Sequence, residues 1–318
     1  MEISTDTEVE PADQPEERGI GARIGIVALN LIAPGLGLCR VGNWRGAVLT
    51  LLATLALLAL LSFGQGHFPV EGFASAIFGL VLAMGLTAAL YIVPMVGTWR
   101  QSRLRDPLGH WSRWYGLTAI VVLLLCLNNL ATLCVHHFYK PYYGAAESMA
   151  PTIGKGDKLV VDMRWRGPPR RGDVIIFQAP DNVRFSRVVA VAGDRIAMRN
   201  GIPIINGVAA VQSPRGTARF TGFDGEQQAA LFVERLPGEA SEHRILDLGP
   251  TEVDTIAPLV VPSGTVFVMG DNRDRSADSR VPMDIGGVGM VATKAIVGRP
   301  LYIFWSKDRA QIGMRLDR

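Results

Sequence analysis

The stretch that decides the fold of this chain covers residues 270–280 and reads Gly270-Asp271-Asn272-Arg273-Asp274-Arg275-Ser276-Ala277-Asp278-Ser279-Arg280. A second stretch, shortly after a long apolar run, reads Glu147-Ser148-Met149-Ala150-Pro151-Thr152. Proline stiffens the turn after Ser148. A hydroxyl nucleophile needs a base, donors for an oxyanion and a means of holding the substrate backbone. Ser148 is therefore the candidate nucleophile, and the question is what surrounds it.

Composition indicates a membrane protein. The chain has 318 residues, of which 48% are hydrophobic and 19% charged, enough for membrane segments and a folded domain. The net charge of +3 and the lack of a basic tract argue against a nucleic-acid partner. Cys39, Cys126 and Cys134 lie in or beside apolar runs and no cysteine follows them, which excludes a disulfide framework or a cysteine zinc site in the polar half.

The first 138 residues divide into a tail and a membrane region. Residues 1–19 are acidic and are expected to be disordered. Within residues 20–138 the apolar segments 73–96 and 115–135 are long enough to span a bilayer, whereas 47–63 is short. The segment 24–38 is interrupted by Pro34-Gly35-Leu36-Gly37 and is expected to be re-entrant or interfacial.

Arginines predict the orientation in the membrane. The loop 98–113 carries Arg100, Arg103, Arg105 and Arg113, whereas the loop 64–72 carries no Lys or Arg. The positive-inside rule then places 98–113 in the cytoplasm and everything after the last span on the outer side.

Residues 139–318 have the pattern of an all-β, mostly antiparallel domain. Short β-branched runs predict strands at 158–163, 173–177, 187–191, 265–269 and 295–304. Asn200-Gly201 and Asn206-Gly207 predict hairpin turns on either side of 202–205. An insert at about 208–260 is expected to be less regular.

The two stretches quoted first resemble motifs of the type I signal peptidases (leader peptidases), which are membrane-bound Ser/Lys endopeptidases. Residues 170–177 and 187–194 also resemble this family, in the order and spacing that its members have. The resemblance covers roughly residues 140–305. It implies a catalytic β domain behind N-terminal transmembrane helices, on the outer face of the cytoplasmic membrane. It also implies a monomer that needs no metal or organic cofactor, and preprotein signal peptides and the lipid bilayer as partners.

The resemblance implies roles for named residues. Ser148 would be the nucleophile and Ser276 the hydroxyl that orients the base. Arg187 with Asp271, and Asp278 with Arg280, would form structural ion pairs. The family's base is a lysine, and Ser186 occupies its position here. A serine hydroxyl is no base at neutral pH, and it is too short to replace a lysine amine.

Substitutes for the missing base are few. Lys155 and Lys158 follow the nucleophile closely in sequence, and His243 belongs to the insert. Three interpretations therefore stay open: a signal-peptide endopeptidase, an impaired one, or a non-catalytic homologue that binds exported or membrane-inserted segments. A self-cleaving repressor of similar β fold is excluded because the chain has membrane segments and no DNA-binding head.

Overall fold

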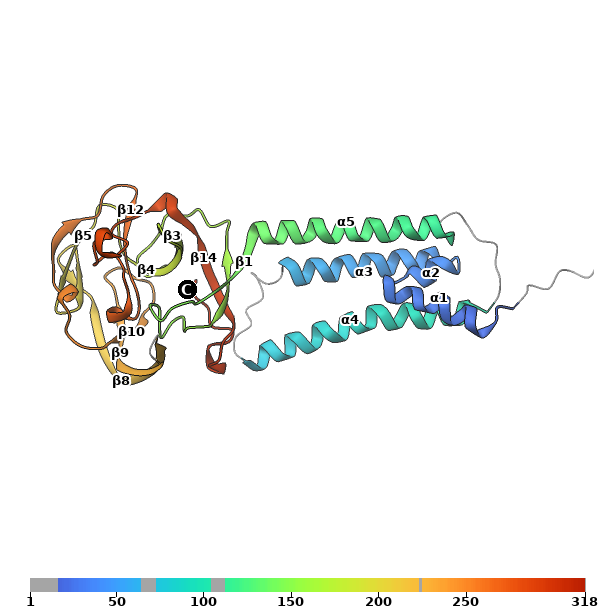
Figure 1. The fold of residues 1–318 in the computed structure, drawn as a ribbon, viewed down its shortest axis with the longest axis horizontal. Helices are drawn as coiled ribbons and strands as arrows, with labels where there is room; N and C mark the ends of the chain where they lie inside the picture. The colour runs from blue at the N-terminus through green and yellow to red at the C-terminus, as the bar shows by residue number, and fades with distance from the viewer. Residues whose placement is uncertain (1–16, 64–72, 104–111, 223–224, 318) are drawn as a thin grey trace, which may run out of the picture. The chain divides into compact units, whose positions relative to one another are not determined.

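The computed structural model describes residues 17–63, 73–103, 112–222 and 225–317 (Figure 1). Most of the predicted acidic tail, the loop 64–72 and part of the loop 98–113 lie outside the described residues. The chain divides into two compact units. One holds residues 1–65 and 80–133, and the other holds 66–79 and 134–318.

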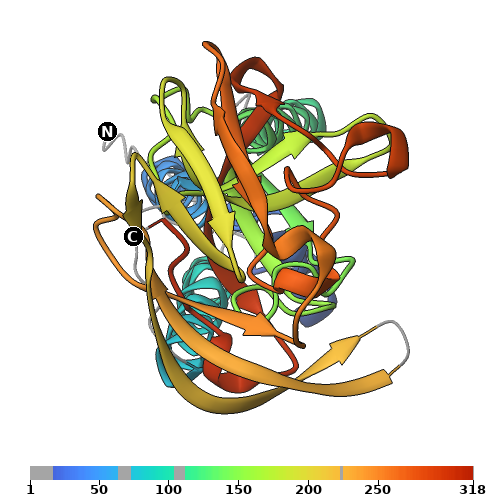
Figure 2. The ribbon, with the colours of Figure 1, turned by 90° about the vertical axis from the view of Figure 1, so that its left-hand side faces the viewer.

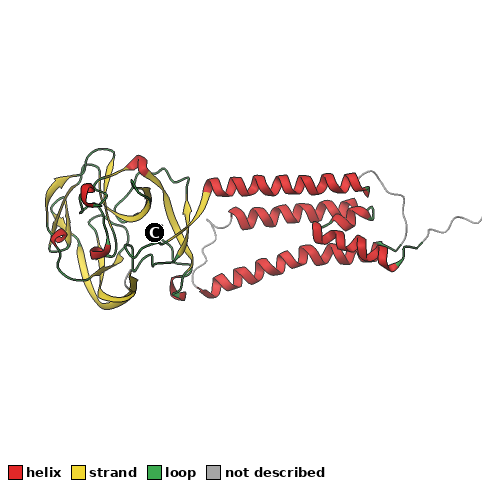
Figure 3. Cartoon of the chain, in the orientation of Figure 1, coloured by secondary structure: helices red, strands yellow, loops and turns green. Residues whose placement is uncertain are grey.

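The first unit is helical, as Figure 3 shows in red. Its elements are α1 (Ile20–Ile32), α2 (Leu36–Arg40), α3 (Trp44–Phe63), and most of α4 (Phe73–Gln101) and α5 (Trp114–Phe138). Each of the four predicted apolar segments therefore contains helix, and each of the last three is a single helix.

Asn30 explains the break in the first apolar segment. Its side-chain oxygen accepts the N–H groups of Gly35 (3.1 Å) and Gly37 (3.2 Å), and its amide donates to Thr98 Oγ1 (3.1 Å). Gly35 takes a φ of 88°, which glycine adopts without strain. The 13 residues of α1 rise only about 20 Å at 1.5 Å per residue, so α1 alone is too short for a hydrocarbon core of about 30 Å.

Two described helical segments are long and apolar enough to cross a membrane, Trp44–Leu61 and Ile77–Gln101. The segment 47–63 was expected to be short for a membrane span. The helix is long enough because it begins at Trp44, three residues before the apolar run. The apolar stretch at the start of α5 is Trp114–Leu130, which is shorter than a span within the described residues. The polar pair Asn128-Asn129 near its end lowers the hydropathy there.

The second unit is built from antiparallel sheets (Figures 1 and 3). Its main sheet has seven strands, in the order β1 (Tyr139–Tyr143), β2 (Lys158–Asp162), β14 (Ile296–Trp305), β3 (Val174–Gln178), β4 (Val183–Val191), β12 (Thr265–Met269) and β13 (Val291–Ala292). A four-stranded sheet orders β11 (Ile256–Val260), β5 (Arg195–Arg199), β6 (Ile202–Ile205) and β7 (Val208–Ala209). The predicted all-β architecture is thus confirmed.

The predicted strands are confirmed to within a few residues. The largest difference is β4, which starts at Val183 instead of 187, because Arg184 and Ser186 interrupt the apolar pattern at its start. The predicted turns around β6 are present, with positive φ at Asn200 (50°) and Asn206 (52°), the backbone that such hairpins require.

The insert is more regular than the sequence predicts. It contains β8 (Val211–Gly222), β9 (Gly225–Arg235) and β10 (His243–Asp247), paired in the order β10-β9-β8. Figure 2 shows β8 and β9 as a long curved ribbon at the bottom of the view. Much of β8 is exposed on both faces, so its sequence lacks the apolar alternation that marks a half-buried strand.

Candidate active site

Ser148 lies in a turn that is fixed by the core on its C-terminal side. Met149, Ala150 and Ile153 are at most 2% exposed, and Met149 and Ile153 pack with residues of β2, β3 and β14. The Ala150 N–H donates to Glu147 O and the Ile153 N–H to Met149 O. Ser148 itself is half-buried, so buried neighbours hold an accessible hydroxyl in place.

Gly270 brings the two key stretches together. A Cβ at this position would lie 2.5 Å from Ser148 O and 2.3 Å from Ser276 Oγ, so only glycine fits. Next to it, the Asn272 N–H donates to Ser148 O at 3.0 Å. The Ser148 N–H makes no hydrogen bond within the described part of the chain and is available to an oxyanion.

The three serines singled out from the sequence line one pocket of about 310 Å³. Ser148 enters it from the turn after β1, Ser186 from β4, and Ser276 from the segment after β12. The remaining walls come from 143–146, 182–185, Met149, Ile153, Arg275 and Ala277. Residues far apart in sequence therefore meet at one cleft.

No lysine or histidine is among the described residues that line this pocket. Ser186 is buried and its Oγ donates to the Phe185 carbonyl at 2.7 Å. Lys155 is exposed, and the Lys158 ammonium lies 5.2 Å from the centre of the Trp305 ring. His243 is buried between two glutamates. None of the three substitutes proposed from the sequence lines the serine pocket.

Arg187 and Asp271 form a buried bidentate pair beside these serines. Arg187 Nε and Nη2 donate to the two carboxylate oxygens at 2.8 and 2.6 Å. Thr152 Oγ1, in the Ser148 turn, donates to the same carboxylate at 2.5 Å. Burial by itself raises the pKa of Asp271, but the charge and hydrogen bonds of Arg187, helped by His243 and Thr152, outweigh it and lower that pKa.

Asp278 and Arg280 form the second pair. Arg280 Nε and Nη2 each donate to a different Asp278 oxygen at 2.9 Å, and both side chains are buried. Asp278 Oδ2 also accepts the Gly270 N–H at 2.9 Å. This pair therefore holds the backbone of the residue that separates Ser148 from Ser276.

Sequence reasoning missed two groups of residues at this site. Gly270 and Thr152 lie inside the two quoted motifs. Their positions in the motifs marked them as candidates, but no role was assigned to either. Glu234 and Glu239 lie in the insert, where no periodicity or motif marks them. Among the described residues, no cluster of His, Cys, Asp or Glu is arranged to hold a metal ion.

Comparison with known proteins agrees with this geometry. A family model described as "Signal peptidase, peptidase S26" matches residues 113–305. The chain belongs to this family. It is 30% identical to signal peptidase I U of Bacillus subtilis over 192 residues, which are 59% of this chain and 87% of that protein. It is 29% identical to a probable signal peptidase I-1 of Synechocystis over 215 residues, 64% of this chain and 90% of that protein.

A solved structure of a signal peptidase I from Enterococcus faecalis is also similar, at 22% identity and a TM-score of 0.25, over 42% of this chain and 97% of that one. Membership in the signal peptidase family thus rests on the sequence match. The type I assignment made from the motifs is confirmed.

The Arg187–Asp271 pair predicts a large loss of stability in Asp271→Ala. The substitution leaves a buried guanidinium without its carboxylate, so the free energy of unfolding should fall by about 3–5 kcal/mol. Asp162→Ala, which breaks the partly exposed pair with Arg164, is the control and should cost at most about 1 kcal/mol. Denaturant unfolding measures both, and equal effects would contradict the buried-pair assignment.

The pKa direction of Asp271 gives that prediction a pH dependence. Because the folded-state value is depressed, the stabilisation is complete above the ordinary aspartate pKa of about 3.9. It is lost as the pH falls through the lower folded-state value. Wild type and Asp271→Ala should therefore converge in stability under strongly acidic conditions.

Gly270→Ala should disrupt the site locally. The added methyl group collides with the Ser148 carbonyl and with Ser276, and overpacking of this kind costs roughly 1–3 kcal/mol. Gly264→Ala is a poor control because its φ of 75° is itself unfavourable for alanine. Gly167→Ala is the better control. Gly167 does not have a left-handed backbone, and an added Cβ would lie 3.4 Å from Trp165 Nε1, an ordinary contact. This substitution should be close to neutral in the same unfolding measurement.

Proposed function

We propose that this protein is a membrane-bound serine endopeptidase that cleaves signal peptides from exported preproteins. Ser148 is the nucleophile, and activity is limited because Ser186 replaces the base. The observation that carries the proposal is the single pocket shared by Ser148, Ser186 and Ser276, in a chain whose relatives are named signal peptidase I.

The proposed chemistry starts at the Ser148 hydroxyl, whose oxygen attacks the carbonyl carbon of the scissile bond. The Ser148 N–H, which has no acceptor within the described residues, stabilises the resulting oxyanion. The proton of the hydroxyl has no amine or imidazole acceptor among the pocket-lining residues. Removing one member of such a catalytic unit costs most of the covalent route, so cleavage should be slow.

An open edge of β4 supports the binding of an extended substrate. On one side, β4 pairs with β3 from Val183 to Arg187. On the other side, pairing with β12 begins only at Arg187. No strand in the described part of the chain pairs with residues 183–186 on this side, and this edge borders the serine pocket. A peptide strand can add to such an edge through main-chain hydrogen bonds, with alternate side chains in shallow pockets.

The second candidate function is non-catalytic binding of exported segments. It is favoured by the same lack of a lysine or histidine in the pocket lining. The open β4 edge would serve a binding protein equally well, because capture of a strand requires no proton transfer.

Membrane insertion completes the proposal. The helical segments Trp44–Leu61 and Ile77–Gln101 would anchor the protein in the cytoplasmic membrane, with α5 as a further span. The β domain would act as a monomer on the outer face. The arginines at 98–113 support this orientation.

Ser186→Lys should create or raise cleavage of a signal peptide with small residues at the first and third positions before the cut. General-base catalysis contributes roughly 10²–10⁴-fold, and the substitution puts an amine into the pocket beside Ser148 and Ser276. The measurement is release of product from a fluorogenic signal-peptide substrate by the detergent-solubilised full chain.

Ser148→Ala in the Ser186→Lys background is the control and should abolish the gain. Ser186→Met fills a similar volume without an amine and should stay at the wild-type rate. A wild-type rate equal to that of Ser186→Lys would refute the missing-base explanation. A folded Ser186→Lys variant that binds the peptide without cleaving it would favour the binding function.

The orientation can be tested by labelling single cysteines in a background without native cysteines. Arg105→Cys should react with a membrane-impermeant reagent only from the cytoplasmic side, and Val208→Cys, which is 59% exposed, only from the outside. Labelling of both from one side would disprove the proposed topology.

A further inference from the structure

His243 occupies a buried position that the proposed chemistry does not use. Its Nδ1 lies 2.8 Å from Glu239 Oε1 and its Nε2 lies 3.2 Å from Glu234 Oε1. The ring and both carboxylates are at most 5% exposed. The Nδ1 contact is a hydrogen bond, whereas the Nε2 contact has the distance of an ion pair but not the geometry of a hydrogen bond. A neutral imidazole has one N–H, so it can serve only one of these carboxylates, whereas an imidazolium has an N–H on both nitrogens and a charge that attracts both carboxylates.

The charges around the ring favour the protonated form. Two guanidinium groups face this cluster, Arg187 from β4 and Arg273 from the segment after β12. Three carboxylates face it, namely Glu234 from β9, Glu239 from the turn after β9, and Asp271. With His243 charged, three cations balance three anions. With His243 neutral, one buried negative charge has no counterpart, which is costly.

The cluster is bonded to the segment that carries the candidate site. Arg273 donates to both oxygens of Glu234, and its carbonyl accepts a bond from Arg280. The Leu246 N–H, three residues after His243, donates to Asp271 O at 2.8 Å. The Asn272 N–H, between Asp271 and Arg273, donates to Ser148 O. The insert therefore holds 271–273 from one side while those residues hold Ser148 from the other.

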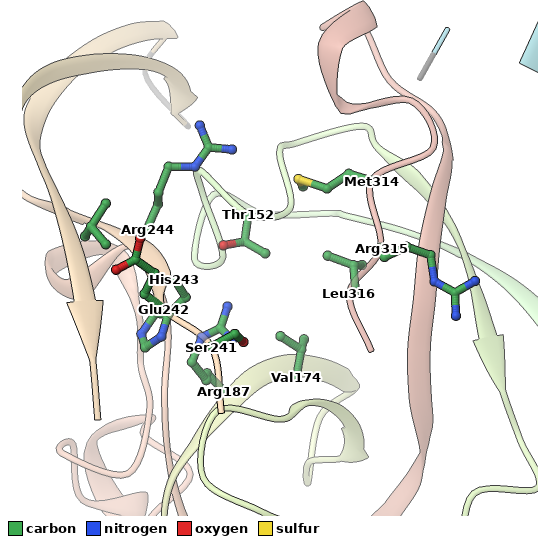
Figure 4. A pocket seen from close by; sticks show the side chains of 11 residues that line it. Thr152, Val174, Arg187, Ser241, Glu242, His243, Arg244, Met314, Arg315 and Leu316 are labelled. Atoms are coloured by element: carbon green, nitrogen blue, oxygen red, sulfur yellow. The ribbon is translucent and has the colours of Figure 1, made fainter. Parts of the chain in front are cut away.

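A second pocket of about 430 Å³ borders this cluster at His243 and Arg187 (Figure 4). His243 and Arg244 line it on one side and Met314 and Leu316 on the other, with Thr152 between them. The Arg315 side chain extends away from the opening in this view. His243 therefore borders a pocket that is separate from the serine pocket.

We propose that His243, as an imidazolium clamped between Glu234 and Glu239, is a positioning residue that holds residues 271–273 against Ser148. It contacts neither the pocket serines nor, by its location, the peptide strand. The inference rests on the proposed function only in that the site it positions is the peptidase site.

The pKa of His243 adds a direction to this proposal. Burial and the charge of Arg187 lower that pKa, but the interactions with Glu234 and Glu239 and the charge of Asp271 outweigh them and raise it. A raised folded-state value means that the clamp is complete below the ordinary histidine pKa of about 6.5. It is lost as the pH rises through the raised value.

The test is site-resolved amide hydrogen exchange of the Asn272 N–H in the full chain, compared between variants at one pH. His243→Gln should speed this exchange at least about tenfold, because an unbalanced buried charge loosens 271–273. His243→Gln with Glu239→Gln removes one negative charge as well and should restore protection. Arg244→Gln, in the next and exposed position of β10, is the matched control and should change nothing.

A change of equal size in β5–β6 would show a general structural role and overturn the proposal. So would a double variant that exchanges as fast as His243→Gln. If His243→Gln does not fold, Glu239→Gln decides the question in a pH series. The exchange rate of the Asn272 N–H, corrected for its intrinsic pH dependence, should rise at a lower pH in Glu239→Gln than in wild type, because Glu239 raises the pKa of His243. The same transition pH in both proteins would refute the clamp.

Activity separates this inference from the proposed function. In the Ser186→Lys background, His243→Gln should lower kcat with little change in KM, and the added Glu239→Gln should recover kcat. If Ser186→Lys is itself inert, the peptidase proposal fails, while the exchange data still decide whether His243 positions the site.

Discussion

The buried bond between Arg187 and Asp271 is the interaction on which the rest of the site depends. Arg187 belongs to the central strand β4, and Asp271 begins the segment that leads to Ser276. The same carboxylate accepts the Thr152 hydroxyl, so one side chain ties the sheet, the Ser148 turn and the 270–280 segment together. Removing one partner of such a pair leaves the other charge buried and unpaired. His243, Glu234 and Glu239 add further charges around it.

The serine site is held together by contacts that do not involve the residue at position 186. The turn at Ser148 is held by the buried side chains of Met149 and Ile153. The approach of the two stretches is held by the missing Cβ of Gly270. Neither depends on the residue at position 186, which packs as a small buried side chain with its hydroxyl satisfied by Phe185 O. These contacts therefore do not require a lysine at position 186.

The strands and turns of the main sheet could be predicted because their causes are local. Short β-branched runs predicted β2, β3 and β12, and Asn-Gly turns predicted both ends of β6. The motifs also indicated which residues meet in the pocket. The ribbon β8–β9 could not be predicted, since it is exposed and lacks a core-facing stripe. The glutamates around His243 could not be predicted either, because their role arises from contacts between distant segments, such as Arg273 with Glu234.

The electrostatics of the serine pocket still suit a base. Among its described lining residues are two arginines, Arg184 and Arg275, and no aspartate or glutamate. The charge of Arg275 and partial burial both disfavour an ammonium ion, whereas Asp181 pairs with Arg184 and offsets its charge. An amine in this pocket would therefore be biased toward the neutral form that accepts a proton. Arg184 is held by Asp181 and by the Ala277 carbonyl, and Arg275 by Gln227. The charges that would tune a base are therefore fixed by contacts that do not involve position 186, and the pocket would retain its ability to activate an amine.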